Sequence, residues 1–165
     1  MSVSTYGFNV EGSFHTLVEA QLAIIQTEIN AALSTSHTIA YYPQRQIETF
    51  PSVRGWVFMG AEADDRRHRL TDRIQLDIFV KSANASYPDR RLAMLIRDGL
   101  MSKLGFSTKR SAFFAHFDVK NYFANPSSPT TLNKCRIEQT SPWQDLPPSD
   151  PLITQFQSDF KLIHL

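Results

Sequence analysis

The first regular pattern in the chain is an apolar stripe at helical spacing. Apolar side chains recur every three or four residues at Phe14, Val18, Leu22, Ile25 and Ile29, the spacing of one buried helix face. Ser13 precedes the stripe, and a serine there can cap the first turn. We therefore expect a helix from residue 13 to the Ser34–Ser36 cluster, preceded by an N-terminal arm over residues 1–12.

The next pattern is the two-residue alternation of a long β-hairpin. Val53, Val57 and Met59 alternate with Arg54, Trp56 and Phe58, and a second alternation places Ile74, Leu76, Ile78 and Val80 on one face. Between them, residues 62–69 contain Glu62, Asp64 and Asp65 together with Arg66, Arg67 and Arg69. A charged segment between two strand patterns predicts the solvated tip of a long hairpin.

A second helix and further strands complete the expected order. Leu92, Ile96, Leu100 and Leu104 form another helical stripe. Strand patterns follow near residues 112–121, 135–140 and 156–162, with a proline-rich loop at 141–151. This order predicts an α+β fold, with two helices packed on one face of a mainly antiparallel β-sheet and a long charged β-hairpin. Residues 13–165 are expected to form a single domain.

Aromatic residues are in surplus on the hairpin strands. Trp56, Phe58 and Phe79 alternate with the inward apolar positions, so they should project from the sheet face that the helices do not cover. That second face needs a cover, which is either the chain's own C-terminal segment or another subunit. Oligomerisation is therefore a hypothesis, and packing within one chain is an equally weighted alternative.

Composition and charge narrow the function classes. The 165 residues are 42% hydrophobic and 20% charged, with a net charge of +1, which argues against disorder and against a dedicated DNA-binding domain. No apolar run reaches the length of about 20 residues needed to span a bilayer, and the first residues lack a signal-peptide pattern, so we expect a cytoplasmic protein without membrane contact. Residues 1–44 contain no Lys or Arg. An acidic first helix and a basic second helix would suit head-to-tail contacts between neighbours.

The sequence offers no pattern typical of catalysis, of a bound cofactor or of a metal site. The five histidines fall in different expected elements, with no pair at i, i+4, and Cys135 is the single cysteine. Asp77 and Glu138 could meet across the sheet as an acid and a base. Solvated strand charges explain these two carboxylates more simply. We therefore expect no enzyme activity.

The arrangement resembles the tail terminator, or tail completion, proteins of long-tailed bacteriophages. The resemblance covers roughly residues 14–165. It rests on the opening helix that ends in Ile-Asn-Ala-Ala-Leu33, the strand, hairpin and strand from Val53 to Lys81 with the segment Arg73 to Val80, the helix from Asp89 to Leu100 after a short polar break, and a final strand pair ending in Phe160 to His164.

The resemblance implies a structural virion protein of the tail or neck, assembled in the host cytoplasm. Such a protein forms a homo-hexameric ring on the tail tube protein, ends tube growth and joins the head-tail connector or stopper, while genome DNA only passes through the lumen. The residues expected to make contacts are Asp64, Asp65, Arg66, Arg67 and Arg69 in the hairpin, Trp56, Phe58 and Phe79 on the second sheet face, and Trp143 in the proline-rich loop, which is longer than a turn requires.

Two other classes remain open at this point. Another neck component, such as a head-tail adaptor or stopper, shares the ring-forming, non-enzymatic character and differs only in its partner. A small enzyme on an α+β sandwich is the other alternative, and it predicts a concave pocket with converging polar groups. Architecture alone does not choose between these classes, since function resides in sites.

Overall fold

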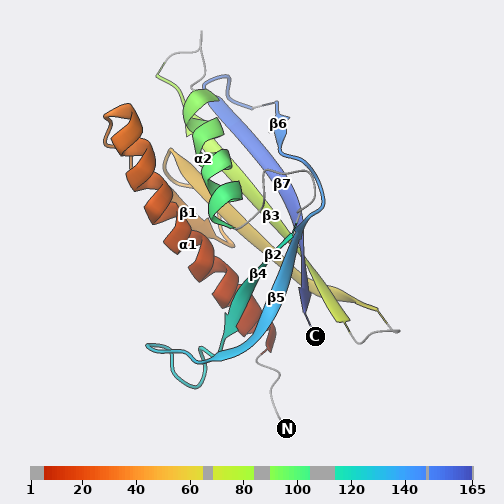
Figure 1. Cartoon of the computed structure of the whole chain (residues 1–165). Helices are drawn as coiled ribbons and strands as arrows, with labels where there is room; N and C mark the ends of the chain where they lie inside the picture. The colour runs from red at the N-terminus through yellow and green to blue at the C-terminus, as the bar shows by residue number, and fades with distance from the viewer. Residues whose placement is uncertain (1–5, 65–68, 84–89, 105–113, 148, 165) are drawn as a thin grey trace.

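Two helices lie on one face of a curled, mixed β-sheet, which confirms the predicted fold class (Figure 1). The computed structural model describes residues 6–64, 69–83, 90–104, 114–147 and 149–164. The helices are α1 (Tyr6–Leu33) and α2 (Arg90–Lys103). The strands are β1 (Ala40–Pro43), β2 (Ser52–Asp64), β3 (Arg69–Lys81), β4 (Phe114–Lys120), β5 (Thr131–Gln139), β6 (Gln144–Leu146) and β7 (Ile153–His164).

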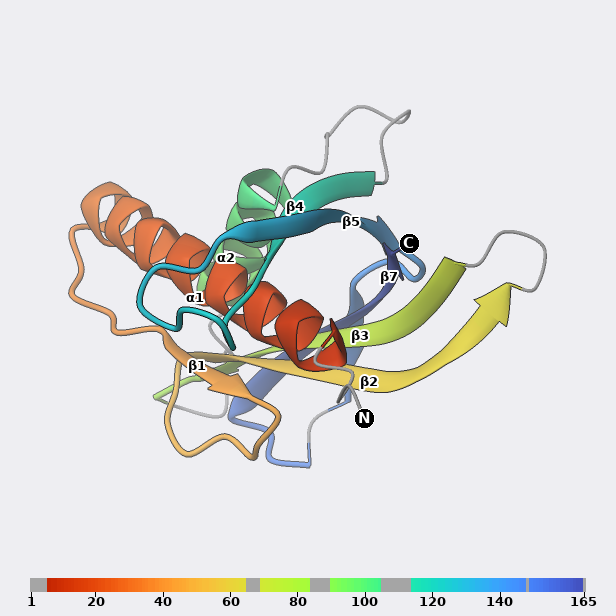
Figure 2. The same ribbon diagram turned by 90° about the horizontal axis from the view of Figure 1, so that it is seen from below.

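The strand order in the sheet is β1-β2-β3-β7-β5-β4, and β6 also pairs with β7. β1 runs parallel to β2, whereas the other pairings are antiparallel. β3 and β7 pair from Leu70↔His164 to Lys81↔Ile153 and form the centre of the sheet. The β2–β3 hairpin projects beyond the helices, and β5 and β4 curl around α1 (Figure 2).

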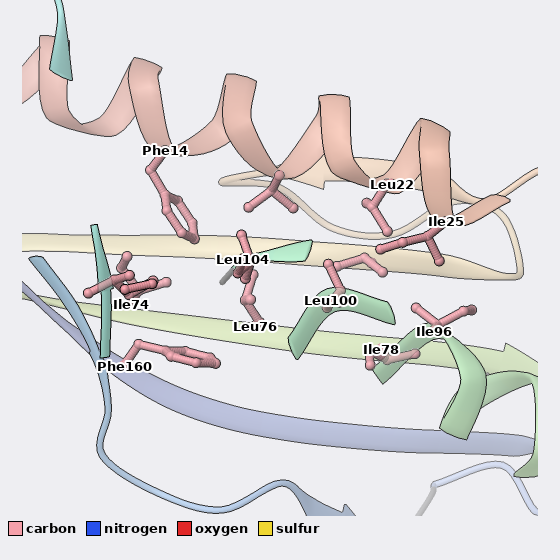
Figure 3. Close-up of a cluster of buried hydrophobic side chains, with 14 of the residues drawn as sticks. Phe14, Leu22, Ile25, Ile74, Leu76, Ile78, Ile96, Leu100, Leu104 and Phe160 are labelled. Carbon is pink, nitrogen blue, oxygen red and sulfur yellow. The ribbon is translucent and has the colours of Figure 1, made fainter. Parts of the chain in front are cut away.

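The core fills the space between the helices and the concave face of the sheet. Phe14, Leu22 and Ile25 of α1 point toward Ile96 and Leu100 of α2 and toward the strands (Figure 3). From the sheet, the core takes fully buried side chains at alternate positions, including Ile74, Leu76, Ile78, Phe160 and Leu162. The predicted apolar faces of both helices and of β3 are therefore confirmed.

The two helices approach each other closely at Gly99 of α2. A Cβ atom at this position would lie 2.9 Å from Cγ2 of Ile25 in α1, so a larger residue would require the Ile25 side chain or a helix to shift. Near the same crossing, Lys103 Nζ contacts Glu28 Oε1 at 2.6 Å. The acidic and basic helices thus meet within one chain, and part of the charge complementarity expected between neighbours is satisfied internally.

The start of α1 differs from the sequence expectation. Residues 6–12, which we placed in an N-terminal arm, are helical, and Val10 is fully buried in the core. Ser13 therefore does not cap the helix. It lies in the third turn, where its Oγ accepts a hydrogen bond from the backbone N–H of Lys120 at 2.8 Å. The hydrophobic pattern does not extend over these turns, because the buried positions Asn9 and Ser13 are polar and accept hydrogen bonds from the backbone at the end of β4.

Candidate interaction surface

The second face of the sheet carries the aromatic residues that the sequence singled out. Because Arg54 pairs with Asp77, Trp56 with Gln75 and Phe58 with Arg73, alternate residues of β2 and β3 share this face, which points away from the helices. We call the side chains of Trp56 and Phe58, together with Arg54 and Arg73 beside their rings, the aromatic face. The Trp56 and Phe58 rings are stacked at 25°, with centroids 6.5 Å apart.

The three predicted aromatic contacts differ in exposure. Phe58 is 46% exposed, Trp56 is half-buried, and Phe79 is buried at 7% exposure. All three lie on the predicted face. Phe79, however, is covered by its own chain, and the Arg54 guanidinium lies 5.0 Å from its ring centroid. Phe58 and part of Trp56 are therefore the aromatic surface that this face exposes.

A buried ion pair organises the aromatic face. Arg54 donates from Nε and Nη2 to Asp77 Oδ2 at 3.0 and 2.8 Å, and the Gln75 amide lies 3.1 Å from both oxygens of the same carboxylate. The Asp77 side chain is completely inaccessible to solvent, which corrects the interpretation of Asp77 as a solvated strand charge. The guanidinium also lies over the Trp56 ring, so this pair fixes the base on which the aromatic side chains rest.

A second, exposed ion pair borders the aromatic face. Arg73 Nη2 donates to Asp159 Oδ1 at 3.0 Å, and its guanidinium carbon lies 5.3 Å from the centroid of the Phe58 ring. The Arg73 side chain is 58% exposed. Lys161, which is opposite Arg73 on β7, is also exposed on this face. The Phe58 ring therefore lies beside an exposed arginine that is itself paired with a carboxylate.

The carboxylate pair considered as an acid and a base does not form. Asp77 forms an ion pair with Arg54, and Glu138 Oε1 lies 2.6 Å from Arg136 Nη2. Each carboxylate is thus held by its own arginine. This arrangement is typical of structural ion pairs on a sheet.

The hairpin residues fall partly outside the described chain. The backbones of Asp64 and Arg69 are the last pair of the β2–β3 ladder, so the predicted long hairpin is confirmed at this level. The register shifts between Phe58 and Glu62, where β2 carries extra residues, which bends the hairpin. Asp65, Arg66 and Arg67 lie outside the described residues, and the contact role of all five charged residues stays a prediction.

Trp143 packs on its own chain. Its ring meets Phe160 edge-on at a centroid distance of 6.3 Å, and it adds to the core between β5 and β6. β6 pairs with β7, and its Asp145 forms an exposed ion pair with Arg90 of α2. The sequence missed β6, because its three residues lie inside a segment dominated by proline and polar side chains. Trp143 is half-buried, so only part of its ring faces outward.

A buried polar cluster joins α1 to β1 and β2. His15 Nδ1 and Tyr41 Oη lie 2.6 Å apart, and burial lowers the pKa of His15 to about 4. Burial and the nearby Glu19 and Glu11 carboxylates raise the pKa of Tyr41. Both side chains are therefore neutral near pH 7. Gly55 lies against them, and a Cβ there would be 2.3 Å from Tyr41 Oη.

The thiol and the metal-ligand types show no reactive arrangement. Cys135 is buried, and burial, with a contribution from Asp72, raises its pKa to about 12, so the nucleophilic thiolate is scarce at neutral pH. Within the described ranges, no three His, Cys, Asp or Glu residues are placed to hold a metal ion. No helix in this part of the chain is both long and apolar enough to cross a bilayer.

A shallow groove of about 420 Å³ lies between α1 and the edge strand β4. Thr16, Leu17 and Ala20 form one side, and His116 and Asp118 are among the residues that form the other. The carboxylate of Asp118 lies 3.6 Å from Lys120 Nζ and 4.0 Å from Lys134 Nζ. The Asp118 carboxylate is thus paired with lysines of its own chain, and the polar groups of the groove do not converge on one ligand position.

Comparisons with known proteins leave the function to be argued from these surfaces: no family model and no curated protein matches the chain.

Proposed function

We propose that this chain is a structural subunit that forms a ring on the end of a bacteriophage tail tube, stops tube growth and joins the tube to the head connector. The proposal takes its functional content from the resemblance to tail terminator proteins. Its support in the structure is the aromatic face. Phe58 and part of Trp56 are exposed on a sheet whose other face is already covered by both helices.

Exposed rings on a rigid sheet favour an assembly role because they mark a surface that a partner can desolvate. The Arg54–Asp77 pair and the stacking of Trp56 on Phe58 hold the rings in one arrangement. A preorganised surface loses little entropy when a partner binds. Trp56 and Phe58 belong to β2, and the β2–β3 hairpin, which projects beyond the helices (Figure 2), would extend the same contact.

In this proposal, the partners are five further copies of the chain, the tail tube protein and the connector or stopper protein, and the site of action is the tail or neck of the virion. The subunit needs no cofactor and performs no catalysis. DNA passes through the lumen without being bound, which suits the net charge of +1 and the absence of Lys and Arg in residues 1–44.

The test compares the protein alone with the protein mixed with the tail tube protein of the same genome. Light scattering gives the mass, and electron microscopy shows the tube ends. We expect rings, or subunits that form rings only on tube ends, and tubes of limited length. A stable monomer that leaves tube ends bare and tube growth unchanged contradicts the proposal. Binding to a portal-side protein instead would assign the chain to an adaptor or stopper.

A matched pair of variants tests whether the aromatic face is needed for capping of tube ends. Phe58→Ser removes the exposed ring of the aromatic face, and Met94→Ser removes a side chain of similar exposure, 42%, on α2. We expect Phe58→Ser to abolish capping of tube ends and Met94→Ser to retain it. Retention of capping by Phe58→Ser would exclude the aromatic face as the contact.

A further inference from the structure

A second exposed aromatic group lies outside the aromatic face, where the start of α1 meets the β4–β5 connection. Phe8, in the first turns of α1, and Phe123, in the β4–β5 connection, are 54% and 57% exposed. Their rings meet edge-on with centroids 4.7 Å apart. We call this pair the aromatic knob. Leu132, 48% exposed, lies at the adjacent irregularity in the β4–β5 ladder.

The aromatic knob is held rigidly by hydrogen bonds between α1 and the end of β4. Asn9 Oδ1 accepts from the backbone N–H of Tyr122 at 3.0 Å, and Ser13 Oγ accepts from that of Lys120. Both acceptors are buried. The Tyr122 ring packs against Gly12, where a Cβ would lie 3.4 Å away. Two exposed rings on such a fixed support are a preorganised apolar surface, which favours binding to a partner.

The surroundings of the aromatic knob differ in charge from those of the aromatic face. Residues 121–133 contain no charged side chain, and α1 carries three glutamates but no Lys or Arg. Of these, Glu11 accepts a hydrogen bond from Gln44 and Glu28 pairs with Lys103. The nearest cations on β4 and β5, Lys120 and Lys134, both lie against Asp118. The aromatic face, in contrast, has the exposed Arg73 and Lys161 at its border, where Asp159 pairs with Arg73 and Glu138 lies opposite Lys161.

We infer that the aromatic knob of one copy binds the aromatic face of the next copy, with Phe8 and Phe123 against Phe58 and Trp56. The two surfaces lie on different sides of one chain, since Phe58 points away from the helices and Phe8 belongs to one of them. They therefore meet only between copies. The carboxylate-bearing α1 of one copy would lie near Arg73 of the next, which adds charge complementarity to the apolar contact.

A contact between two different surfaces has a consequence for assembly. Each copy offers one aromatic knob and one aromatic face, so copies join head to tail, and such contacts close into rings when the rotation permits. The inference rests on the proposed function for its biological setting. It specifies which parts of neighbouring subunits meet.

Cysteine pairing tests this contact directly. Phe8→Cys and Phe58→Cys are each made in the full-length chain, and the native Cys135 is fully buried and does not compete. After mild oxidation of an equal mixture, we expect the disulfide-linked heterodimer to exceed the two homodimers together. Random collisions would give no such excess. Contacts between like surfaces would give homodimers in each variant alone.

Two controls complete the test. Met94→Cys, mixed with either variant, should give no more linked dimer than random collision. Exposed Cys variants that show the native circular dichroism spectrum but no excess of heterodimer at any protein concentration would overturn the inference. Rings on tube ends without the Phe8–Phe58 link would overturn this contact and leave the proposed function standing. If the Phe8–Phe58 link forms in a protein that does not bind tube ends, the contact stands and the proposed function is contradicted.

Discussion

The Arg54–Asp77 pair allows a quantitative test of how the aromatic face is built. Asp77 is fully buried and accepts two hydrogen bonds from Arg54, and the Gln75 amide is the other polar group at its oxygens. Among the described residues, Arg54→Met leaves Gln75 as the hydrogen-bond donor to the buried carboxylate. Removal of one partner from a buried pair costs roughly 3–5 kcal/mol. We expect about 3 kcal/mol, near the lower end, because Gln75 still donates.

Substitution of the other partner, Asp77, should lower the free energy of unfolding by less. Asp77→Asn keeps the shape and leaves Arg54, whose side chain is 20% exposed and reaches water. Its loss is then close to that of a hydrogen bond to a charged group, about 1.5–2 kcal/mol. The double variant should cost less than the sum of the two, because the second change removes the group that the first left unpaired.

Urea denaturation measures these differences. With a slope of about 2 kcal/mol/M, Arg54→Met should lower the unfolding midpoint by about 1.5 M. Arg73→Met is the control on the same face, since Arg73 forms an exposed pair with Asp159 and should contribute about 1 kcal/mol or less. If Arg54→Met costs no more than Arg73→Met, or less than Asp77→Asn, the reasoning is wrong.

Three further outcomes follow from the buried polar cluster of His15, Tyr41 and Gly55 and from the hydrogen bond of Ser13. Gly55→Ala should destabilise the protein by about 1–3 kcal/mol because its Cβ meets Tyr41 Oη, and Tyr41→Phe in the same chain should recover part of that loss in a thermal melt. His15 has a pKa of about 4 when folded and an ordinary value of 6.5. The contribution of neutral His15 to the free energy of unfolding is therefore complete above pH 6.5. It is lost as the pH falls toward 4, by up to about 3 kcal/mol. His15→Phe should therefore flatten the fall in stability across this pH range. Ser13→Ala should cost about 1–3 kcal/mol and speed hydrogen exchange at the Lys120 amide, which loses its acceptor; unchanged exchange there would show that the bond is not needed.

Hydrophobic periodicity predicted the fold class because the core faces are nearly pure. The α1 stripe from Phe14 to Ile29 and the alternation from Ile74 to Val80 have no polar interruption on the buried side. The N-terminal turns of α1 escaped prediction for the opposite reason. There, Asn9 and Ser13 are buried and bind backbone groups of distant residues. A local pattern carries no signal of such a partner.

The position of the aromatic residues was predicted in outline. Alternation placed Trp56, Phe58 and Phe79 on the second face, but it did not show that Phe79 is covered by its own chain. The burial of Asp77 depends on Arg54, which is 23 residues away. The aromatic knob escaped as well, because Phe8 and Phe123 are far apart in the chain and meet only after folding.

Capping of tube ends tests the central claim most directly. The purified protein is added to a growing preparation of the tail tube protein, and the tube lengths and tube ends are measured by electron microscopy. The proposed function predicts short tubes that carry a ring of this protein at the end, and loss of both with Phe58→Ser but not with Met94→Ser. Tubes that grow to the same length with bare ends, with or without the protein, would contradict it.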